Sequence, residues 1–148
     1  MLKLPPPLWA LIYTGLCVAV SAFLGWPRLI GASAAALGMI LVVVGVILPV
    51  WAALLFRRER TEINPTSPAN HKLVTSGPFR VTRNPMYLGL VIVTLGVAVW
   101  VGAWPMFLAP IAVAATANWV HIPYEEAKMR RQFPADFEAY ASRVRRWI

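Results

Sequence analysis

Residues 73–89 of this chain read LVTSGPFRVTRNPMYLG, a polar, turn-rich segment with two arginines that lies between two long apolar runs. A carboxylate pair, Glu125-Glu126, follows directly after the last apolar run. The chain has 148 residues, of which 59% are hydrophobic and only 14% are charged. Polar groups at the ends of membrane-length segments are costly and commonly functional. These two regions therefore predict where the chemistry takes place.

Four apolar segments surround these regions, and none contains Asp, Glu, Lys or Arg: residues 8–24, 31–56, 86–101 and 106–122. As a helix at ~1.5 Å per residue the second would be about 39 Å long, which exceeds the ~30 Å hydrocarbon core. It must tilt, protrude or bend, and Pro49 allows a bend. Gly38 and Gly45 predict a face for close helix packing. The last two spans are predicted to form a tight helical hairpin.

The basic residues predict the orientation. All lysines and arginines except Arg28 lie at the N-terminus, between the second and third spans, or after the fourth. The positive-inside rule then places both termini and the long central loop in the cytoplasm. A cleaved signal peptide is an alternative for the first span, although its apolar run is rather long and no clear A-x-A site follows.

The predicted fold is an all-α integral membrane bundle of four transmembrane helices. It is one domain over residues 1–148, with two spans in residues 1–56 and the polar loop, hairpin and tail in residues 57–148. The net charge of +8 is explained by membrane orientation, because no nucleic-acid-binding motif is present. No metal site is predicted, and the single cysteine, Cys17, is interpreted as a small buried hydrophobe.

Asn84-Pro85 predicts the start of the third helix, because Asn is a preferred N-cap and Pro suits the first helical position. The free N–H groups of that helix start could bind a carboxylate or a phosphate. Arg80 and Arg83 precede it and would make the mouth of a pocket that attracts anions. The alternative is an ordinary helix cap with juxtamembrane basic residues.

Asn118, His121 and Glu125 fall on one stripe of the last apolar helix. Pro123 interrupts that helix and frees the carbonyl of Trp119, which predicts a bent backbone with unpaired groups. Such backbone is tolerated at membrane depth mainly where it lines a cavity. Taken singly, His121 could be an interfacial histidine, and Glu125-Glu126 could be favourable charges in the first turn of a helix.

The tail places four apolar side chains on one helical stripe: Phe133, Phe137, Tyr140 and Val144. With the arginines nearby, this pattern predicts a cytoplasmic amphipathic C-terminal helix against the lipid headgroups. The same helix could also cap the polar pocket.

Segments 61–89, 125–126, 133–140 and 143–148 together resemble the isoprenylcysteine carboxyl methyltransferase family, of a bacterial type related to phospholipid N-methyltransferases. The likeness covers residues 56–148, and the separated pieces match in order. The resemblance implies a compact membrane bundle that binds S-adenosylmethionine at its cytoplasmic end. It also implies methyl transfer to a lipophilic, prenyl or lipid-like acceptor, in a bacterial inner membrane. The lack of a G-x-G-x-x-G motif agrees with a bundle rather than a doubly wound sheet.

The resemblance further implies the residues of the site. The cofactor would be cradled, largely through backbone groups, by His71, Lys72, Leu73 and Val74. Phe79 stands where the family usually has a Tyr beside the cofactor. The family's His-Pro-x-Tyr segment is matched by Asn84, Pro85, Met86 and Tyr87, with Asn in place of His. Glu125 matches the carboxylate thought to hold the cofactor's amino group.

These assignments suit the charges of S-adenosylmethionine. Glu125 can pair with its ammonium group, and Arg83 or the helix start at Asn84 can take its carboxylate. The ring of Tyr87 can face its sulfonium. A carboxylate acceptor would need no strong base, whereas His121 could accept the proton of an amine or a thiol.

The chain departs from the family at one turn. The family usually has an Arg before the carboxylate pair, where it contacts the acceptor, but here the turn begins with His121. Losing a bidentate cation weakens the case for a carboxylate acceptor such as a prenylated cysteine. Arg80 could substitute from another helix.

Two other classes of protein remain open on the sequence. One is a membrane reductase that binds a nicotinamide dinucleotide at the same face, whose phosphates would require more cations than Arg80 and Arg83. The other is a non-enzymatic membrane bundle, which would leave the stripe of Asn118, His121 and Glu125 without a task.

Overall fold

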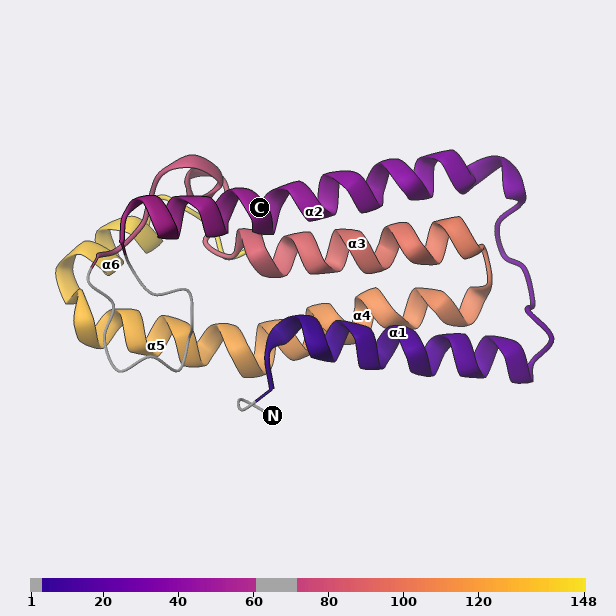
Figure 1. The fold of residues 1–148 in the computed structure, drawn as a ribbon. Helices are drawn as coiled ribbons and strands as arrows, with labels where there is room; N and C mark the ends of the chain where they lie inside the picture. Colours follow the sequence, from indigo (N-terminus) through magenta and orange to yellow (C-terminus); the bar gives the residue numbers. More distant parts are fainter. Residues whose placement is uncertain (1–3, 61–71) are drawn as a thin grey trace.

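The computed structural model describes residues 4–60 and 72–148, and over these residues its secondary structure is helical apart from an isolated bridge between Arg28 and Ala103 (Figure 1). The elements follow in the order α1 (Pro6–Phe23), η1 (Ala32–Ala34), α2 (Ala35–Arg58), η2 (Gly77–Arg80), α3 (Pro85–Val101), η3 (Trp104–Phe107), α4 (Leu108–Thr116), η4 (Ala117–His121), α5 (Ile122–Gln132) and α6 (Pro134–Ala141). The predicted all-α class is confirmed.

Three helical segments of the described chain are long and apolar enough to cross a membrane: Pro6–Phe23, Ala32–Arg58 and Trp104–Gln132. The fourth predicted span corresponds in chain order to the third of these segments, while the third predicted span is α3, an apolar helix of 17 residues. Large apolar side chains cover the outside of the bundle, and Leu11, for example, is 68% exposed. Such a surface suits lipid rather than water.

Glycines bring α2 and α3 closer together than any larger residue would allow. A Cβ atom placed on Gly38 would lie 2.5 Å from the backbone nitrogen of Trp100, and one on Gly45 would lie 2.6 Å from that of Val93. Both contacts are with backbone, which cannot move aside. The predicted packing face of α2 is therefore confirmed, and α2 continues through Pro49.

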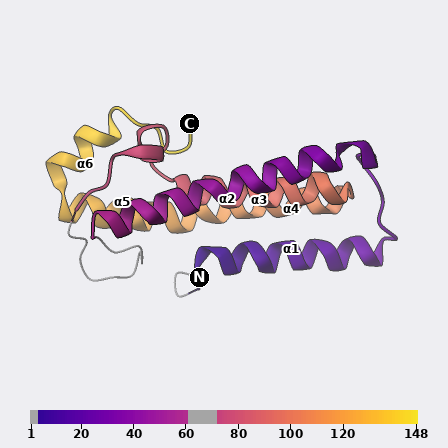
Figure 2. The same ribbon diagram turned by 45° about the horizontal axis from the view of Figure 1, so that its top comes forward.

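The helix α1 lies along one side of the bundle, against α4 (Figures 1 and 2). The hydroxyls of Tyr13 and Thr116 form a hydrogen bond of 2.8 Å between these helices. Cys17 is buried in the same region, as predicted. Beyond α1, the N–H of Leu29 donates to the carbonyl of Gly102, which fixes the first connection to the turn of the hairpin.

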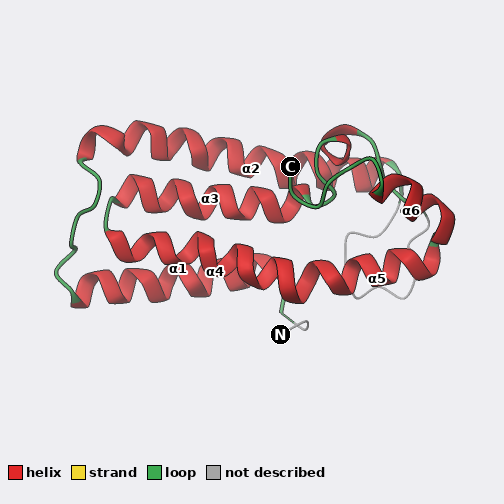
Figure 3. Cartoon of the chain, turned by 180° about the vertical axis from the view of Figure 1, so that it is seen from behind, coloured by secondary structure: helices red, strands yellow, loops and turns green. Residues whose placement is uncertain are grey.

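The last apolar helix is longer than the sequence predicted. The elements α4, η4 and α5 follow one another without a break and form one long rod that passes Pro123 and ends at Gln132 (Figure 3). At the predicted irregularity the backbone forms a five-residue π-helix, η4. The expected interruption at Pro123 is thus a local widening of the helix.

The C-terminal helix α6 also differs from its prediction. It spans only eight residues, so the predicted stripe from Phe133 to Val144 is not one continuous helix. Phe137 and Tyr140 are 3% and 5% exposed and pack against Ala52, Val74 and Phe79. The apolar face of α6 therefore covers the protein rather than lipid headgroups.

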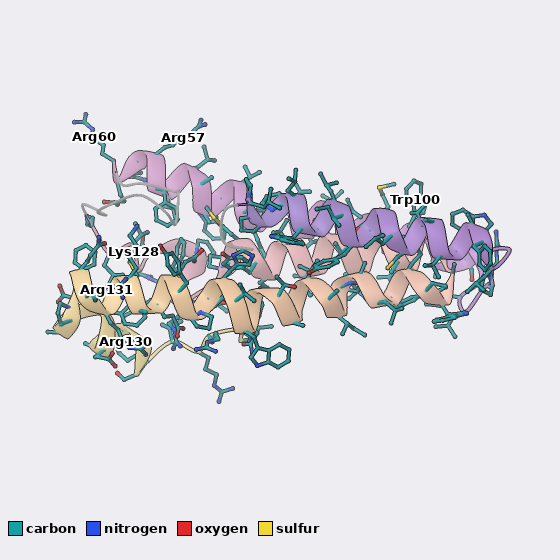
Figure 4. All side chains as sticks on the ribbon, turned by 90° about the horizontal axis from the view of Figure 1, so that it is seen from below. Arg57, Arg60, Trp100, Lys128, Arg130 and Arg131 are labelled. Carbon is teal, nitrogen blue, oxygen red and sulfur yellow. The ribbon has the colours of Figure 1, made fainter. Side chains whose placement is uncertain are left out.

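Charged residues gather at one end of the bundle. Figure 4 shows Arg57, Arg60, Lys128, Arg130 and Arg131 at this end, while Trp100 lies toward the other. We call this the polar end. The first turn of α3, the helix α5 and the helix α6 all lie near it (Figure 1).

Candidate functional site

A tyrosine and a carboxylate from two different helices meet at the polar end. Tyr87 lies in the first turn of α3 and is only 5% exposed. Its hydroxyl donates a hydrogen bond of 2.5 Å to Oε1 of Glu125, which lies on α5. The helix α3 begins at Pro85, as predicted, because the fixed φ of proline suits the first helical position. The two residues that the sequence assigned to one small-molecule site are therefore in contact.

His121 lies beside this pair. Its ring stacks on the ring of Tyr87, with centroids 5.8 Å apart and an interplanar angle of 21°. The residue is 4% exposed, and its Nε2 atom is buried without a hydrogen-bond partner among the described residues. Tyr87, His121 and Glu125 thus present a phenol, an imidazole and a carboxylate to one small region.

The π-helix η4 explains how His121 reaches this position. Pro123 has no N–H group, so the carbonyl four residues earlier, on Trp119, loses its helical partner. Nearby, the N–H of Ile122 donates to the carbonyl of Ala117, five residues back, which is the π-helical pattern. Single π-turns inside α-helices are frequent at functional sites. Here the turn ends at His121 itself.

The neighbouring acid, Glu126, binds two arginines from distant parts of the chain. It is 5% exposed. Arg83 donates to its Oε1 through Nη2 at 2.8 Å and through Nε at 3.2 Å, and Arg146 donates to its Oε2 through Nη2 at 2.7 Å. Arg130 adds a weaker contact at 4.0 Å. Glu126 therefore connects α5 with the start of α3 and with the end of the chain.

We call residues 141–148, from the last residue of α6 to the end of the chain, the C-terminal tail, and the segment that precedes α3 holds it. Arg83 Nη1 donates to the carbonyls of Ala141 and Val144, at 3.1 and 2.6 Å. Asn84 Nδ2 donates to the carbonyl of Arg146 at 2.9 Å. Asn84 occupies the predicted N-cap position, but its side chain makes no capping hydrogen bond. The side chains of Arg83 and Asn84 therefore bind the tail, while the predicted binding of a carboxylate by Arg83 or by the helix start at Asn84 stays a prediction.

The tail also reaches the π-helix. Trp147 Nε1 donates to Oδ1 of Asn118 at 3.1 Å, and Arg146 Nη1 approaches the same oxygen at 3.5 Å. Trp147 packs against the cluster that contains Tyr87 and Ile122. The sequence placed Asn118 on the functional stripe but did not predict its partners. The sequence signal that could have predicted this contact is the basic end of the chain, because an arginine there, such as Arg146, can pair with an acid such as Glu126.

Several residues predicted to cradle a cofactor pack their side chains into a hydrophobic cluster, while the predicted contact of their backbone groups with a cofactor stays a prediction. Val74 and Phe79 are each 7% exposed and pack with Leu73, Met86 and Tyr140. The hydroxyl of Tyr140 donates to the carbonyl of Phe79 at 2.7 Å. Burial raises the pKa of this hydroxyl well above its ordinary value, and the positive charge of Arg83 offsets only part of the effect. The cluster includes Met86, so it packs against the first turn of α3, which carries Tyr87.

The remaining predicted residues lie apart from the Tyr87–Glu125 contact or outside the description. His71 lies outside the described residues. Lys72 forms a 2.6 Å ion pair with Glu59, and the hydrogen bond and charge of Lys72 hold the pKa of Glu59 below its ordinary value. Arg80 ends η2 and is exposed. Its predicted contact with an acceptor stays a prediction.

Residues 33–136 of the chain match the family described as phospholipid methyltransferase. Protein-S-isoprenylcysteine O-methyltransferase B of Arabidopsis thaliana is 32% identical over 114 residues, which cover 72% of this chain and 55% of that protein. The probable protein-S-isoprenylcysteine O-methyltransferase of Oryza sativa subsp. indica is 31% identical over 114 residues, covering 72% and 56%. The chain thus spans little more than half the length of these curated relatives. No solved structure matches it.

Proposed function

We propose, since this chain belongs to the phospholipid methyltransferase family, that it transfers the methyl group of S-adenosylmethionine to a lipophilic acceptor at the polar end of its bundle. The observation that carries the proposal is the contact between Tyr87 on α3 and Glu125 on α5, beside the Nε2 atom of His121, which has no hydrogen-bond partner among the described residues. A carboxylate suits the ammonium group of S-adenosylmethionine, and an aromatic ring suits its sulfonium.

The residues fit the charges of this cofactor. S-adenosylmethionine supplies an activated methyl group on a positively charged sulfur. Glu125 is the carboxylate for the ammonium group, because its neighbour Glu126 is already paired with Arg83 and Arg146. The face of Tyr87 is suited to a cation. The donors of Arg83 are committed elsewhere, so we assign the carboxylate of the cofactor to the first-turn N–H groups of α3, at Met86 and Tyr87.

Alignment is the main task of such a site. Methyl transfer is an in-line displacement, and holding the reacting atoms in line accounts for much of the rate. The hydrogen bond from Tyr87 fixes the carboxylate of Glu125, while the stacked ring of His121 fixes one wall beside it. Glu126 on α5 binds Arg83, which precedes α3, and Arg146 of the tail. These ion pairs fix the distance between α3, which carries Tyr87, and α5, which carries Glu125.

The acceptor is proposed to reach the site from the bilayer. The bundle exposes apolar side chains along its length, and the similar proteins are named for methylation of isoprenylcysteine. The basic residues at the polar end support a cytoplasmic position for it under the positive-inside rule. We propose that the protein lies in a bacterial inner membrane, with both termini cytoplasmic.

A nicotinamide-dependent reductase is the competing activity. Its dinucleotide would bring two phosphates to the polar end, and these would need free guanidinium or ammonium groups. The arginine nearest the start of α3, Arg83, already binds Glu126 and two tail carbonyls. The arrangement therefore favours S-adenosylmethionine, which carries one carboxylate in place of the phosphates.

Calorimetry of the full chain in lipid nanodiscs tests the proposal. S-adenosylhomocysteine should bind, and NADH and NADPH should not. Glu125→Gln keeps an acceptor for Tyr87 but removes the charge, and a charge-assisted hydrogen bond contributes about 1.5–3 kcal/mol. We therefore expect affinity for S-adenosylhomocysteine to fall by about 10- to 100-fold in this variant.

The matched control is Glu138→Gln on α6. Glu138 pairs with Arg130 at the surface, where both side chains are about half exposed or more, so its loss should leave cofactor binding unchanged. If the Glu125 variant bound S-adenosylhomocysteine as tightly as the wild type, the assignment of the ammonium site would be wrong. If the wild type failed to bind it, the proposed function itself would be wrong.

A further inference from the structure

We infer that the acceptor of this site is a cysteine-type thiol carried on an apolar molecule, whose proton is taken by the imidazole of His121. The inference rests on the methyltransferase function proposed above and names the nucleophile of that same site. It starts from the chemical groups that the site leaves unused.

His121 is the first of these groups. Its side chain is buried, and its Nε2 atom has no hydrogen-bond partner within the described residues. A buried polar atom without a partner is unfavourable, and such an atom in a native structure requires an explanation. In a site that also contains Tyr87 and Glu125, the explanation is a ligand that donates a proton or a hydrogen bond to this nitrogen.

The cations of the site are the second consideration. Arg83 and Arg146 both bind Glu126, and their other donors go to tail carbonyls and to Asn118. Lys128 on α5 is also engaged. A carboxylate acceptor would therefore bring its negative charge next to Glu125 with only Arg80 left to pair with it, and Arg80 is exposed at the end of η2 with no recorded contact to Tyr87, His121 or Glu125. The site suits an acceptor that arrives without negative charge.

Proton affinities then separate a thiol from an amine. The ordinary pKa values are about 6.5 for histidine, 8.5 for a cysteine thiol and 10.4 for a lysine-type ammonium. The equilibrium constant for proton transfer to imidazole is therefore about 1/100 when the donor is the thiol and about 1/10,000 when the donor is the ammonium. Glu125 would further stabilise the ammonium and would be drawn away from the cofactor. A neutral thiol avoids both problems.

The chemical step balances with these groups. The S–H bond of the acceptor breaks, its proton moves to Nε2 of His121, and its electron pair stays on the acceptor sulfur. That pair forms the new bond to the methyl carbon, while the bond from this carbon to the donor sulfonium breaks and its electrons return to the donor sulfur. The products are a methyl thioether and S-adenosylhomocysteine. The positive charge passes from the sulfonium to the imidazolium of His121, which then releases the proton to solvent.

The test uses the full chain in nanodiscs and three acceptors whose side chain is the nucleophile: the N-decanoyl derivatives of cysteine, lysine and aspartic acid, each with its α-carboxyl group blocked as the primary amide. N-acetyl-S-farnesylcysteine is added as a second carboxylate. Methyl transfer to each is measured with labelled S-adenosylmethionine, and binding of the cysteine and aspartic acid compounds is measured without it, by tryptophan fluorescence. We expect the cysteine compound to bind more tightly and to be methylated fastest.

His121→Gln keeps a polar side chain of similar reach but cannot act as the base. General bases contribute about 100- to 10,000-fold, so turnover of the thiol should fall at least about 100-fold. Binding of S-adenosylhomocysteine should stay within about twofold of the wild type, since Glu125 is intact. Ser21→Ala is the matched control, because within residues 4–60 and 72–148 Ser21 Oγ is the other buried side-chain atom without a hydrogen-bond partner, and its helix α1 ends away from the polar end. Its activity should be unchanged.

Each contrary outcome has its own meaning. Faster methylation of a carboxylate or of the amine would overturn the thiol assignment and leave the methyltransferase function intact. Full thiol turnover in His121→Gln would overturn the role of the imidazole. Failure of the wild type to bind S-adenosylhomocysteine would remove the proposed function and this inference with it.

Discussion

Replacing Glu126 by Gln should destabilise the protein more than any other single loss of charge at the polar end. Glu126 is 5% exposed and accepts hydrogen bonds from Arg83 and Arg146, which come from opposite ends of the site. The substitution keeps the shape of the side chain and removes only its charge. Two guanidinium groups then lose their counterion, and one of them is well buried.

The structure sets the size of the effect. Breaking a buried ion pair from one side costs about 3–5 kcal/mol. The side chain of Arg83 is 13% exposed, but that of Arg146 is 35% exposed and can regain water. We therefore expect a loss near the lower limit, about 3 kcal/mol. For a chain of this size, about 2–4 °C per kcal/mol corresponds to a fall in Tm of about 6–12 °C.

The single cysteine provides the assay. Cys17 is buried in α1, so a thiol-reactive fluorescent dye should label it only as the detergent-solubilised protein unfolds. Glu138→Gln is the control, because its ion pair with Arg130 is exposed and worth less than about 1 kcal/mol. Trypsin should also cleave after Arg145 sooner in the folded Glu126 variant, which would release residues 146–148. Equal shifts in Tm for the two glutamine variants would refute the view that Glu126 holds the tail.

Two further substitutions test the helix packing and the support of the site. Gly45→Ala should lower stability by about 1–3 kcal/mol, because its Cβ would lie 2.6 Å from the nitrogen of Val93. A Cβ on Gly15 in α1 meets nothing within 4 Å, so Gly15→Ala should not lower stability in the same dye assay and can raise it by up to about 1 kcal/mol through helix propensity. Tyr140→Phe should cost about 1 kcal/mol at pH 7 through the lost hydrogen bond to the carbonyl of Phe79. The raised pKa of Tyr140 means that the folded chain keeps this proton while the unfolded chain releases it above about pH 10, so wild-type stability should fall there and that of the Phe variant should fall less.

The helices could be predicted because hydropathy and turn residues are local signals. Four uncharged runs correspond to the membrane-length helices and to α3, and Pro85 and Gly102 mark the first and the C-cap residue of α3. The close approach of α2 and α3 was also readable from Gly38 and Gly45, since small residues at helical spacing have few other uses in an apolar helix. Each of these features is determined by residues that lie close together in the sequence, which is why it could be predicted.

The course of the tail could not be predicted in the same way. Periodicity placed Phe137 and Tyr140 on one face, but a face that suits lipid headgroups suits the protein surface equally well. What decides between them is the set of hydrogen bonds from Arg83 and Asn84 to tail carbonyls. Backbone acceptors carry no sequence signature. The π-helix was missed for a related reason, since Pro123 permits either a kink or a widened turn and tertiary contacts select between them.

The sequence assigned Tyr87 and Glu125 to one site, but it did not show which of the two adjacent acids, Glu125 or Glu126, would serve a ligand. Glu125 and Glu126 differ by 100° around the helix axis, so one faces Tyr87 while the other faces the arginines. A carboxylate already bound by two guanidinium groups has little left to offer a ligand cation. Glu126 therefore fixes the distance between α3, α5 and the tail. Glu125, whose recorded hydrogen bond comes from the neutral hydroxyl of Tyr87, is the acid that we assign to the ammonium group of a ligand, and this division makes the site both rigid and selective for a cation.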